Sequence, residues 1–120
     1  MRIKTATATG VTLNWLVAKA KNTLFPLGSV VLDQKRLLVS NEFVVYAPST
    51  NWNQAGPIIA DWRVCTDIGH DGVWLAWVKQ NYEDKPEFMQ SGPTLLVAAM
   101  RTFVTSRLGR EVDVPEELKN

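Results

Sequence analysis

The segment 93–108 constrains the fold most, because its beginning, its interior and its end all specify the same structure. Pro93 in a first helical turn loses only an N–H that would be unpaired there, and Gly109 is a natural C-terminal stop. An apolar stripe recurs at helical spacing and consists of Leu96, Val97, Met100, Phe103 and Val104. Another side carries Thr94, Ala98, Arg101 and Thr105. We therefore predict a long helix that packs its apolar stripe against a core.

A second helix is predicted over 11–22, where Thr9 can serve as the N-cap. Its apolar face consists of Leu13, Leu16, Val17 and Ala20. Trp15 and Lys19 project from the opposite side. Trp15 therefore either packs against a second element or borders a pocket, and packing is the more common role of a tryptophan.

Short runs of β-branched and aromatic residues predict strands. Three runs separated by polar turns indicate an antiparallel meander, and they lie at 30–32, 37–39 and 43–46. Two more runs, at 62–67 and 73–78, flank the glycine-containing turn 69–72 and predict a hairpin of the same sheet.

The segment 79–90 is interpreted as an excursion at the surface. The acidic tail 111–118 forms either a last strand or a short helix that opens at Pro115. The chain 1–120 is thus predicted to be a single α+β domain, in which a small antiparallel sheet packs against two main helices.

Composition narrows the function classes. Thirteen Lys and Arg against twelve Asp and Glu leave a formal charge of +1, which provides no driving force for general nucleic-acid binding. No apolar run approaches the roughly 18 residues of a membrane span, so no membrane partner is expected. The single cysteine, Cys65, permits no internal disulfide, and we expect a soluble protein of a reducing cytoplasm.

Residues that could carry chemistry are few. One histidine and one cysteine cannot complete a zinc site, so we expect no metal and no cofactor. Cys65 and His70 could pair in nucleophilic catalysis, but a buried structural cysteine is the favoured interpretation. The carboxylates lie at turns or beside polar residues, where solvated side chains are expected. They are Asp61, Asp67, Asp71, Glu83 and Asp84.

The uncharged stretch 47–57 is predicted to be a loop, and its part 49–56 is the strongest binding candidate. It offers hydroxyl and amide groups around an indole, which suit the edge and the ring of a heterocycle. The N-terminus of the helix 93–108 suits an anion, which Arg101 would reinforce, while Trp15 would close one wall. The candidate ligand-binding residues are Ser49, Thr50, Asn51, Trp52, Asn53, Gln54, Gly56, Thr94, Arg101 and Trp15.

The same residues also have a purely structural interpretation. The polar side chains would satisfy the backbone of their own loop. Trp52 would cap the core, and Arg101 would pair with an acidic side chain. Local sequence leaves both interpretations open.

Four blocks of the chain carry a family resemblance, and they lie at 13–20, 48–59, 92–101 and 108–118. The second block reads Pro-Ser-Thr-Asn-Trp-Asn-Gln-Ala-Gly-Pro-Ile-Ile, and the third reads Gly-Pro-Thr-Leu-Leu-Val-Ala-Ala-Met-Arg. Together they resemble the lambdoid-phage NinX family almost end to end. The family pattern has aspartate where this chain has Asn14 and Asn51, a second glycine at Ala55 and a charged stretch after Ile59. These departures favour binding over acidic catalysis.

The resemblance implies an accessory gene of a temperate phage or prophage, whose product acts in the cytoplasm of the bacterial host. It implies no set of catalytic residues. Combined with the segment 49–56, it favours a non-enzymatic binder of a small polar, nucleotide-like ligand, which would sequester a host defence signal.

Two other functions stay open. The chain could be a protein-interaction module that docks on a host or phage protein through exposed aromatic side chains. A small hydrolase or transferase that uses Asp61 or His70 ranks last. Five tryptophans in 120 residues also make a homodimer slightly favoured.

Overall fold

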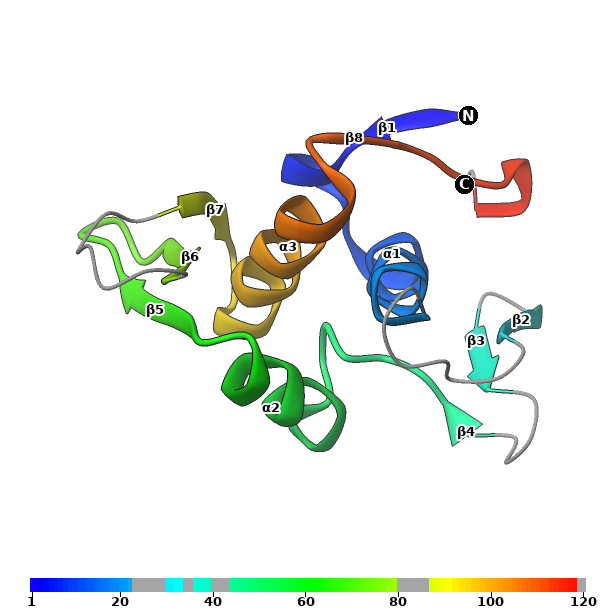
Figure 1. Ribbon diagram of the computed structural model, residues 1–120, viewed down its shortest axis with the longest axis horizontal. Helices are drawn as coiled ribbons and strands as arrows, with labels where there is room; N and C mark the ends of the chain where they lie inside the picture. The colour runs from blue at the N-terminus through cyan, green and yellow to red at the C-terminus, as the bar shows by residue number, and fades with distance from the viewer. Residues whose placement is uncertain (23–29, 34–35, 40–43, 80–86, 119–120) are drawn as a thin grey trace.

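A helix buried on all sides lies at the centre of the fold. The computed structural model describes residues 1–22, 30–33, 36–39, 44–79 and 87–118. Through their middle runs α3 (Leu95–Leu108) (Figure 1). Thr94 Oγ1 accepts a hydrogen bond from Val97 N at 3.2 Å and caps the helix, while Gly109, with a φ of 92°, ends it. The predicted helix is confirmed, but Pro93 precedes the cap and does not lie in the first turn.

The helix α3 lacks the single apolar face that the sequence predicts. Every residue from 96 to 105 is buried, because other elements pack around the whole helix. The buried polar residues Arg101, Thr102 and Thr105 each form hydrogen bonds. Polar contacts therefore lie inside the core of this protein as well as at its surface.

The second predicted helix is confirmed as α1 (Gly10–Asn22), which packs beside α3. Its buried residues include Leu13 and Leu16. Trp15 is half-buried and packs against the core, with Lys19 Nζ 5.3 Å from the centroid of its ring. Of the two interpretations of Trp15, the structure shows packing.

A third helix, α2 (Trp52–Asp61), stands where the sequence predicts a loop. Asn51 caps it, since its Oδ1 accepts a hydrogen bond from Asn53 N at 2.9 Å. The helix forms although Pro57 lies inside it and lacks the N–H of a regular turn. The loop prediction is confirmed for 47–51 and wrong for 52–57, because Ala55 and Ile58 are buried in the core and this packing outweighs poor local propensity.

One antiparallel sheet covers one side of α3 and consists of β5 (Val64–Ile68), β6 (Trp74–Val78) and β7 (Glu87–Gly92). Ala76 and Val78 of β6 are buried towards the helix. The predicted hairpin is confirmed as β5 and β6, which pair from Val64 opposite Val78 to Ile68 opposite Trp74.

The strand β7 corrects the surface excursion that the sequence predicts over 79–90. Thr102 of α3 supplies the reason, because its Oγ1 lies 2.8 Å from Ala76 O and 2.9 Å from Phe88 O. This hydroxyl holds β6 and β7 against the helix. Residues 80–86 of the predicted excursion lie outside the described residues.

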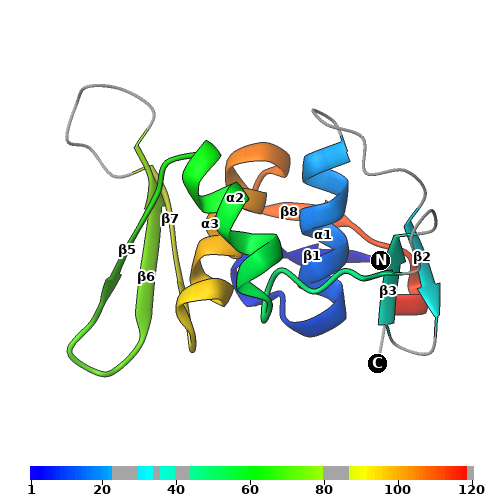
Figure 2. The same ribbon diagram turned by 90° about the horizontal axis from the view of Figure 1, so that it is seen from below.

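The predicted meander is confirmed as β2 (Val30–Asp33), β3 (Arg36–Val39) and β4 (Val44–Val45), while Phe43 lies outside the described residues. The helices lie between this sheet and the β5–β7 sheet (Figure 2). The prediction that the hairpin joins the same sheet is therefore wrong. Each sheet covers a different helix, since β3 packs on α1 and β6 packs on α3.

A third sheet pairs β1 (Arg2–Lys4) antiparallel with β8 (Glu111–Asp113). The short 3₁₀ helices η1 (Thr5–Thr7) and η2 (Glu116–Leu118) lie after these strands. Both predictions for the acidic tail are thus confirmed, as a strand and then a short helix. In the ranges that the structure describes, no helix is long and apolar enough to cross a membrane.

Gly92 allows β7 to approach α3 closely. A Cβ at this position would lie 2.8 Å from Ala98 N and 3.2 Å from Ala98 Cα. We predict that Gly92→Ala lowers the free energy of unfolding by about 1–3 kcal/mol, because the backbone of a buried helix must move. Gly56→Ala is the matched control: nothing lies within 4 Å of its Cβ, and alanine should stabilise α2 by about 0.5–1 kcal/mol. Urea denaturation measures both, and equal effects would contradict the close approach.

We predict that the protein loses stability at alkaline pH because of Tyr46. Its side chain is buried, its hydroxyl has no hydrogen-bond partner among the described residues, and burial raises the pKa to about 12. The folded state therefore favours the protonated phenol, and its contribution to stability is complete below pH ~10 and is lost between pH ~10 and ~12. The loss should amount to about 2–3 kcal/mol. Tyr46→Phe should remove it, as measured by urea denaturation across this range; parallel pH profiles for both proteins would contradict the prediction.

Candidate functional site

Arg101, a predicted anion ligand, donates hydrogen bonds to backbone carbonyls of two other segments. Its Nε donates to Ala8 O at 2.9 Å, and its Nη1 donates to Ser91 O at 2.8 Å. The residue is 8% exposed, and burial lowers the pKa of its guanidinium. Its partners are carbonyls and not the acidic side chain of the structural interpretation. Thr94, the other predicted anion ligand, uses its hydroxyl oxygen as the cap of α3.

The backbone around the start of α2 is bound by polar side chains of α2 itself, of the preceding turn and of α1. Gln54 Oε1 accepts from Ala47 N at 2.6 Å, and Gln54 Nε2 donates to Val45 O at 2.8 Å. Thr50 Oγ1 donates to Ala47 O at 3.4 Å. Ser49 is buried, and its N donates to Asn14 Oδ1 of α1 at 3.0 Å. The structural interpretation therefore describes these contacts well.

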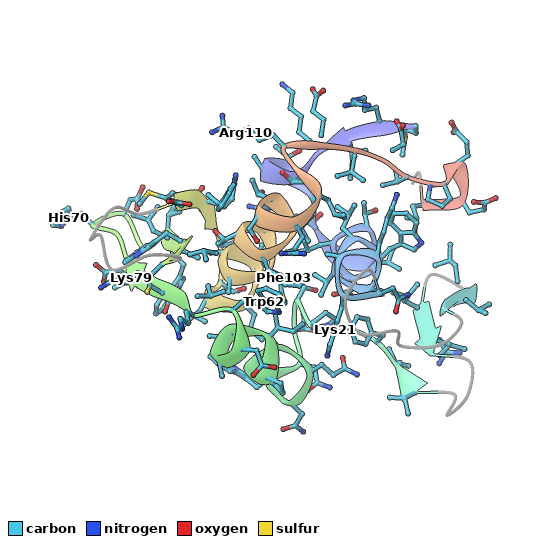
Figure 3. All side chains as sticks on the ribbon, in the orientation of Figure 1. Lys21, Trp62, His70, Lys79, Phe103 and Arg110 are labelled. Carbon is cyan, nitrogen blue, oxygen red and sulfur yellow. The ribbon has the colours of Figure 1, made fainter. Side chains whose placement is uncertain are left out.

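Three other residues of the predicted segment lie at the beginning of α2. Trp52 is 58% exposed, so the interpretation in which it caps the core is wrong. Asn53 is exposed beside it, and Gly56 lies one turn further along the helix. The residues of the segment 49–56 thus lie in the turn before α2 and in its first turns. Arg101 lies on α3, where its guanidinium donates hydrogen bonds to Ala8 O and Ser91 O. Trp62, which follows α2, packs on Phe103 with 5.8 Å between ring centroids (Figure 3).

Four of the residues considered for catalysis lie along the β5–β6 hairpin: Cys65, Asp67, His70 and Asp71. Cys65 is half-buried and not buried as predicted, and its Sγ lies 3.8 Å from Arg63 O. His70 is exposed at the β5–β6 turn (Figure 3). The Asp67 and Asp71 carboxylates accept from backbone N–H groups at the same turn. Within the described ranges, no three His, Cys, Asp or Glu side chains form a group that could hold a metal ion.

A groove that the sequence analysis missed lies where α3 ends. Its volume is about 770 Å³, and its walls come from β1 with η1, from β7, and from the connection between α3 and β8. It is lined by Arg2, Lys4, Thr5, Ala6, Met89, Gln90, Leu108, Gly109, Arg110 and Glu111. We call these ten residues the terminal groove. Figure 3 shows Arg110 on the outside of the fold, at the point where the chain leaves α3 for β8.

The terminal groove has an excess of positive charge. Arg2 Nε lies 3.1 Å from Glu111 Oε2, and Arg2 Nη1 lies 3.8 Å from Asp113 Oδ1. Within the described part of the chain, Lys4 and Arg110 form no ion pair. Two cationic side chains are therefore available to a ligand, whereas the one carboxylate of the groove contacts Arg2.

Local sequence carries little signal for this groove. Arg2 and Lys4 lie on the same face of β1, because side chains alternate along a strand. In a strand of three residues this alternation is too short to predict a strand or a binding site from the sequence. Arg110 joins them only because Lys4 pairs with Glu111 in the β1–β8 register.

The contacts of Arg101 predict a structural role for it. We expect Arg101→Met to lower the free energy of unfolding by about 2–4 kcal/mol, because two carbonyls lose a charged donor inside the protein. Arg107→Met is the matched control on the same helix. Arg107 is exposed and lies 4.9 Å from the Trp62 ring centroid, so its loss should cost about 0.5–1 kcal/mol. Chemical denaturation measures both, and similar costs would contradict the assignment.

The comparison with protein families supports the resemblance of the first three blocks, 13–20, 48–59 and 92–101, while the block 108–118 lies beyond the matched residues. The family model described as "Bacteriophage P22, NinX" matches residues 4–107, which is most of the chain. The match includes α1, α2 and all of α3 except Leu108. No curated protein matches the chain. The chain therefore belongs to the bacteriophage P22 NinX family.

Proposed function

We propose that this phage accessory protein binds a small anionic, nucleotide-like ligand in the terminal groove and holds it without chemical conversion. The observation that carries the proposal is the presence of two cationic side chains, Lys4 and Arg110, that form no ion pair within the described residues and line one groove. A phosphate group is the ligand chemistry that such a pair suits best, because charged N–H donors form strong hydrogen bonds to its oxygens.

The rest of the groove suits the non-phosphate part of such a ligand. Met89, which is 47% exposed, and Leu108 provide apolar surface for a planar ring, and a thioether packs well on aromatic faces. Gln90 adds an amide that can donate and accept at a base edge. The volume of about 770 Å³ lies in the usual range for small-molecule sites.

The type of groups in the groove supports binding without conversion. Lys4 and Arg110 neutralise charge, and the one carboxylate among the residues that line the groove, Glu111, is a half-exposed partner of Arg2. A protein of this kind would act in the host cytoplasm by lowering the free concentration of a nucleotide signal, such as one used in host defence.

The test is binding of AMP, ADP, ADP-ribose and cyclic di-AMP, measured by thermal shift and by isothermal titration calorimetry. A nucleotide at 100 times its Kd should stabilise the native state by about 2.7 kcal/mol and raise the Tm. The Lys4→Ala, Arg110→Ala double variant should bind at least about tenfold more weakly, since each lost charge-assisted contact costs about 1.5–3 kcal/mol. Chromatography of the recovered nucleotide should show it intact.

Arg63→Ala is the matched control, because Arg63 is exposed and does not line the groove. Its affinity should stay within about twofold of the wild-type value. A wild-type protein that no nucleotide stabilises, or an equal loss in the control, would refute the proposal.

Docking on another protein is the second candidate, and the exposure of Trp52 favours it. Val44 and Val45 are also exposed, at 43% and 40%. Exposed aromatic side chains are common anchors of protein interfaces. A protein partner that is recovered with the wild-type chain and lost with a folded Trp52→Ala variant would support docking.

The same variant locates the nucleotide. Unchanged nucleotide affinity of Trp52→Ala supports the terminal groove, whereas loss of nucleotide binding assigns the ligand to the segment 49–56.

A further inference from the structure

We infer that the terminal groove takes a ligand with two adjacent anionic groups, such as a diphosphate, and that Glu111 competes with the ligand for the second of its two cationic positions. The inference rests on the function proposed above. The cationic side chains of the groove form two sets. Lys4 and Arg110 have no ion-pair partner among the described residues, whereas Arg2 contacts carboxylates.

The β1–β8 register shows which acidic residue lies opposite each cationic residue of β1. Lys4 lies directly opposite Glu111, and Arg2 lies directly opposite Asp113. The Glu111 carboxylate nevertheless reaches diagonally to Arg2 Nε, at 3.1 Å. Arg2 therefore has a carboxylate on each side, while Lys4 has none as an ion-pair partner in the described part of the chain.

A first phosphate can bind Lys4 and Arg110 without displacing any group. A second phosphate attached to it then lies near Arg2, because residues two apart on one strand face are only about 7 Å apart. Because the first phosphate is already bound, the second phosphate has a high effective concentration at Arg2. Binding at Arg2 requires that the Glu111 carboxylate be displaced.

That displacement has a small cost. The side chains of Arg2 and Glu111 are 61% and 51% exposed, and ion pairs of this kind are worth about 0–1 kcal/mol. A phosphate carries more charge than a carboxylate and presents three acceptor oxygens. A diphosphate therefore gains Arg2, whereas a single phosphate is already satisfied by Lys4 and Arg110.

The experiment uses inorganic phosphate and pyrophosphate as probes, titrated by calorimetry at constant ionic strength and pH into the full chain. Wild-type protein should bind pyrophosphate at least about fivefold more tightly than phosphate, as one additional charged contact provides about 1 kcal/mol. Arg2→Ala should lower affinity for pyrophosphate by about that factor and change phosphate binding less than twofold.

Glu111→Gln should have the opposite effect. It removes the closer of the two carboxylates that contact Arg2 and leaves Asp113 at 3.8 Å. Pyrophosphate affinity should therefore rise by about threefold to fivefold, and phosphate affinity should rise by a smaller factor because only a repulsion is removed. In the Arg2→Ala background, Glu111→Gln should lose its selectivity for pyrophosphate. Glu117→Gln is the matched control, since it removes the same charge outside the groove and should change neither ratio.

The outcomes separate the two proposals. If Lys4→Ala with Arg110→Ala abolishes binding but Arg2→Ala weakens both probes equally, the two-anion inference fails and the proposed function stands. Equal strengthening of both probes by Glu111→Gln overturns the competition by Glu111. If nucleotides bind in the groove and pyrophosphate binds no more tightly than phosphate, the inference is again wrong. If neither nucleotides nor these anions bind the wild-type protein, both proposals are refuted.

Discussion

The buried guanidinium of Arg101 is the interaction on which the rest of the structure depends. Its two hydrogen bonds join α3 to Ala8, between η1 and α1, and to Ser91 in β7. A charge is tolerated inside a protein only where such bonds replace its hydration, so the contact specifies how both segments lie on α3. Thr102 does the same for β6 and β7. A helix surrounded on all sides thus positions its neighbours by polar contacts as well as by apolar packing.

The terminal groove follows from this arrangement. Its β7 wall is tied to α3 through Ser91, and its other wall continues from β1 through η1 to Ala8, so both walls are anchored on Arg101. The floor forms where Gly109, at a φ of 92°, turns the chain out of α3 into β8. The cations of the groove lie on the solvent side of this frame. Binding there can change their contacts without disturbing the core.

The segment 49–56 and the terminal groove show why composition is a poor guide to a binding site. Gln54 has an amide that can donate and accept, and it contacts the backbone at Ala47 and Val45. Lys4 has only donors, and the carboxylate opposite it contacts Arg2 instead. A polar side chain is available to a ligand when the fold leaves it without a partner. That property depends on neighbours in space and not on residue type.

Sequence alone determined α1, the body of α3 with its Gly109 stop, the β5–β6 hairpin and the family, whereas the Thr94 cap of α3 emerged only from the structure. The two helices and the hairpin depend on residues close together in the sequence, while the family depends on blocks distributed along most of the chain. Tertiary structure decided that 52–61 is a helix, that the strands form separate sheets and that Arg101 is buried. It also created the groove, in which Arg2 contacts Glu111 although the two residues are 109 positions apart in the sequence. The reason is physical: burial and partnership are properties of contacts between distant segments, and local propensity does not contain them.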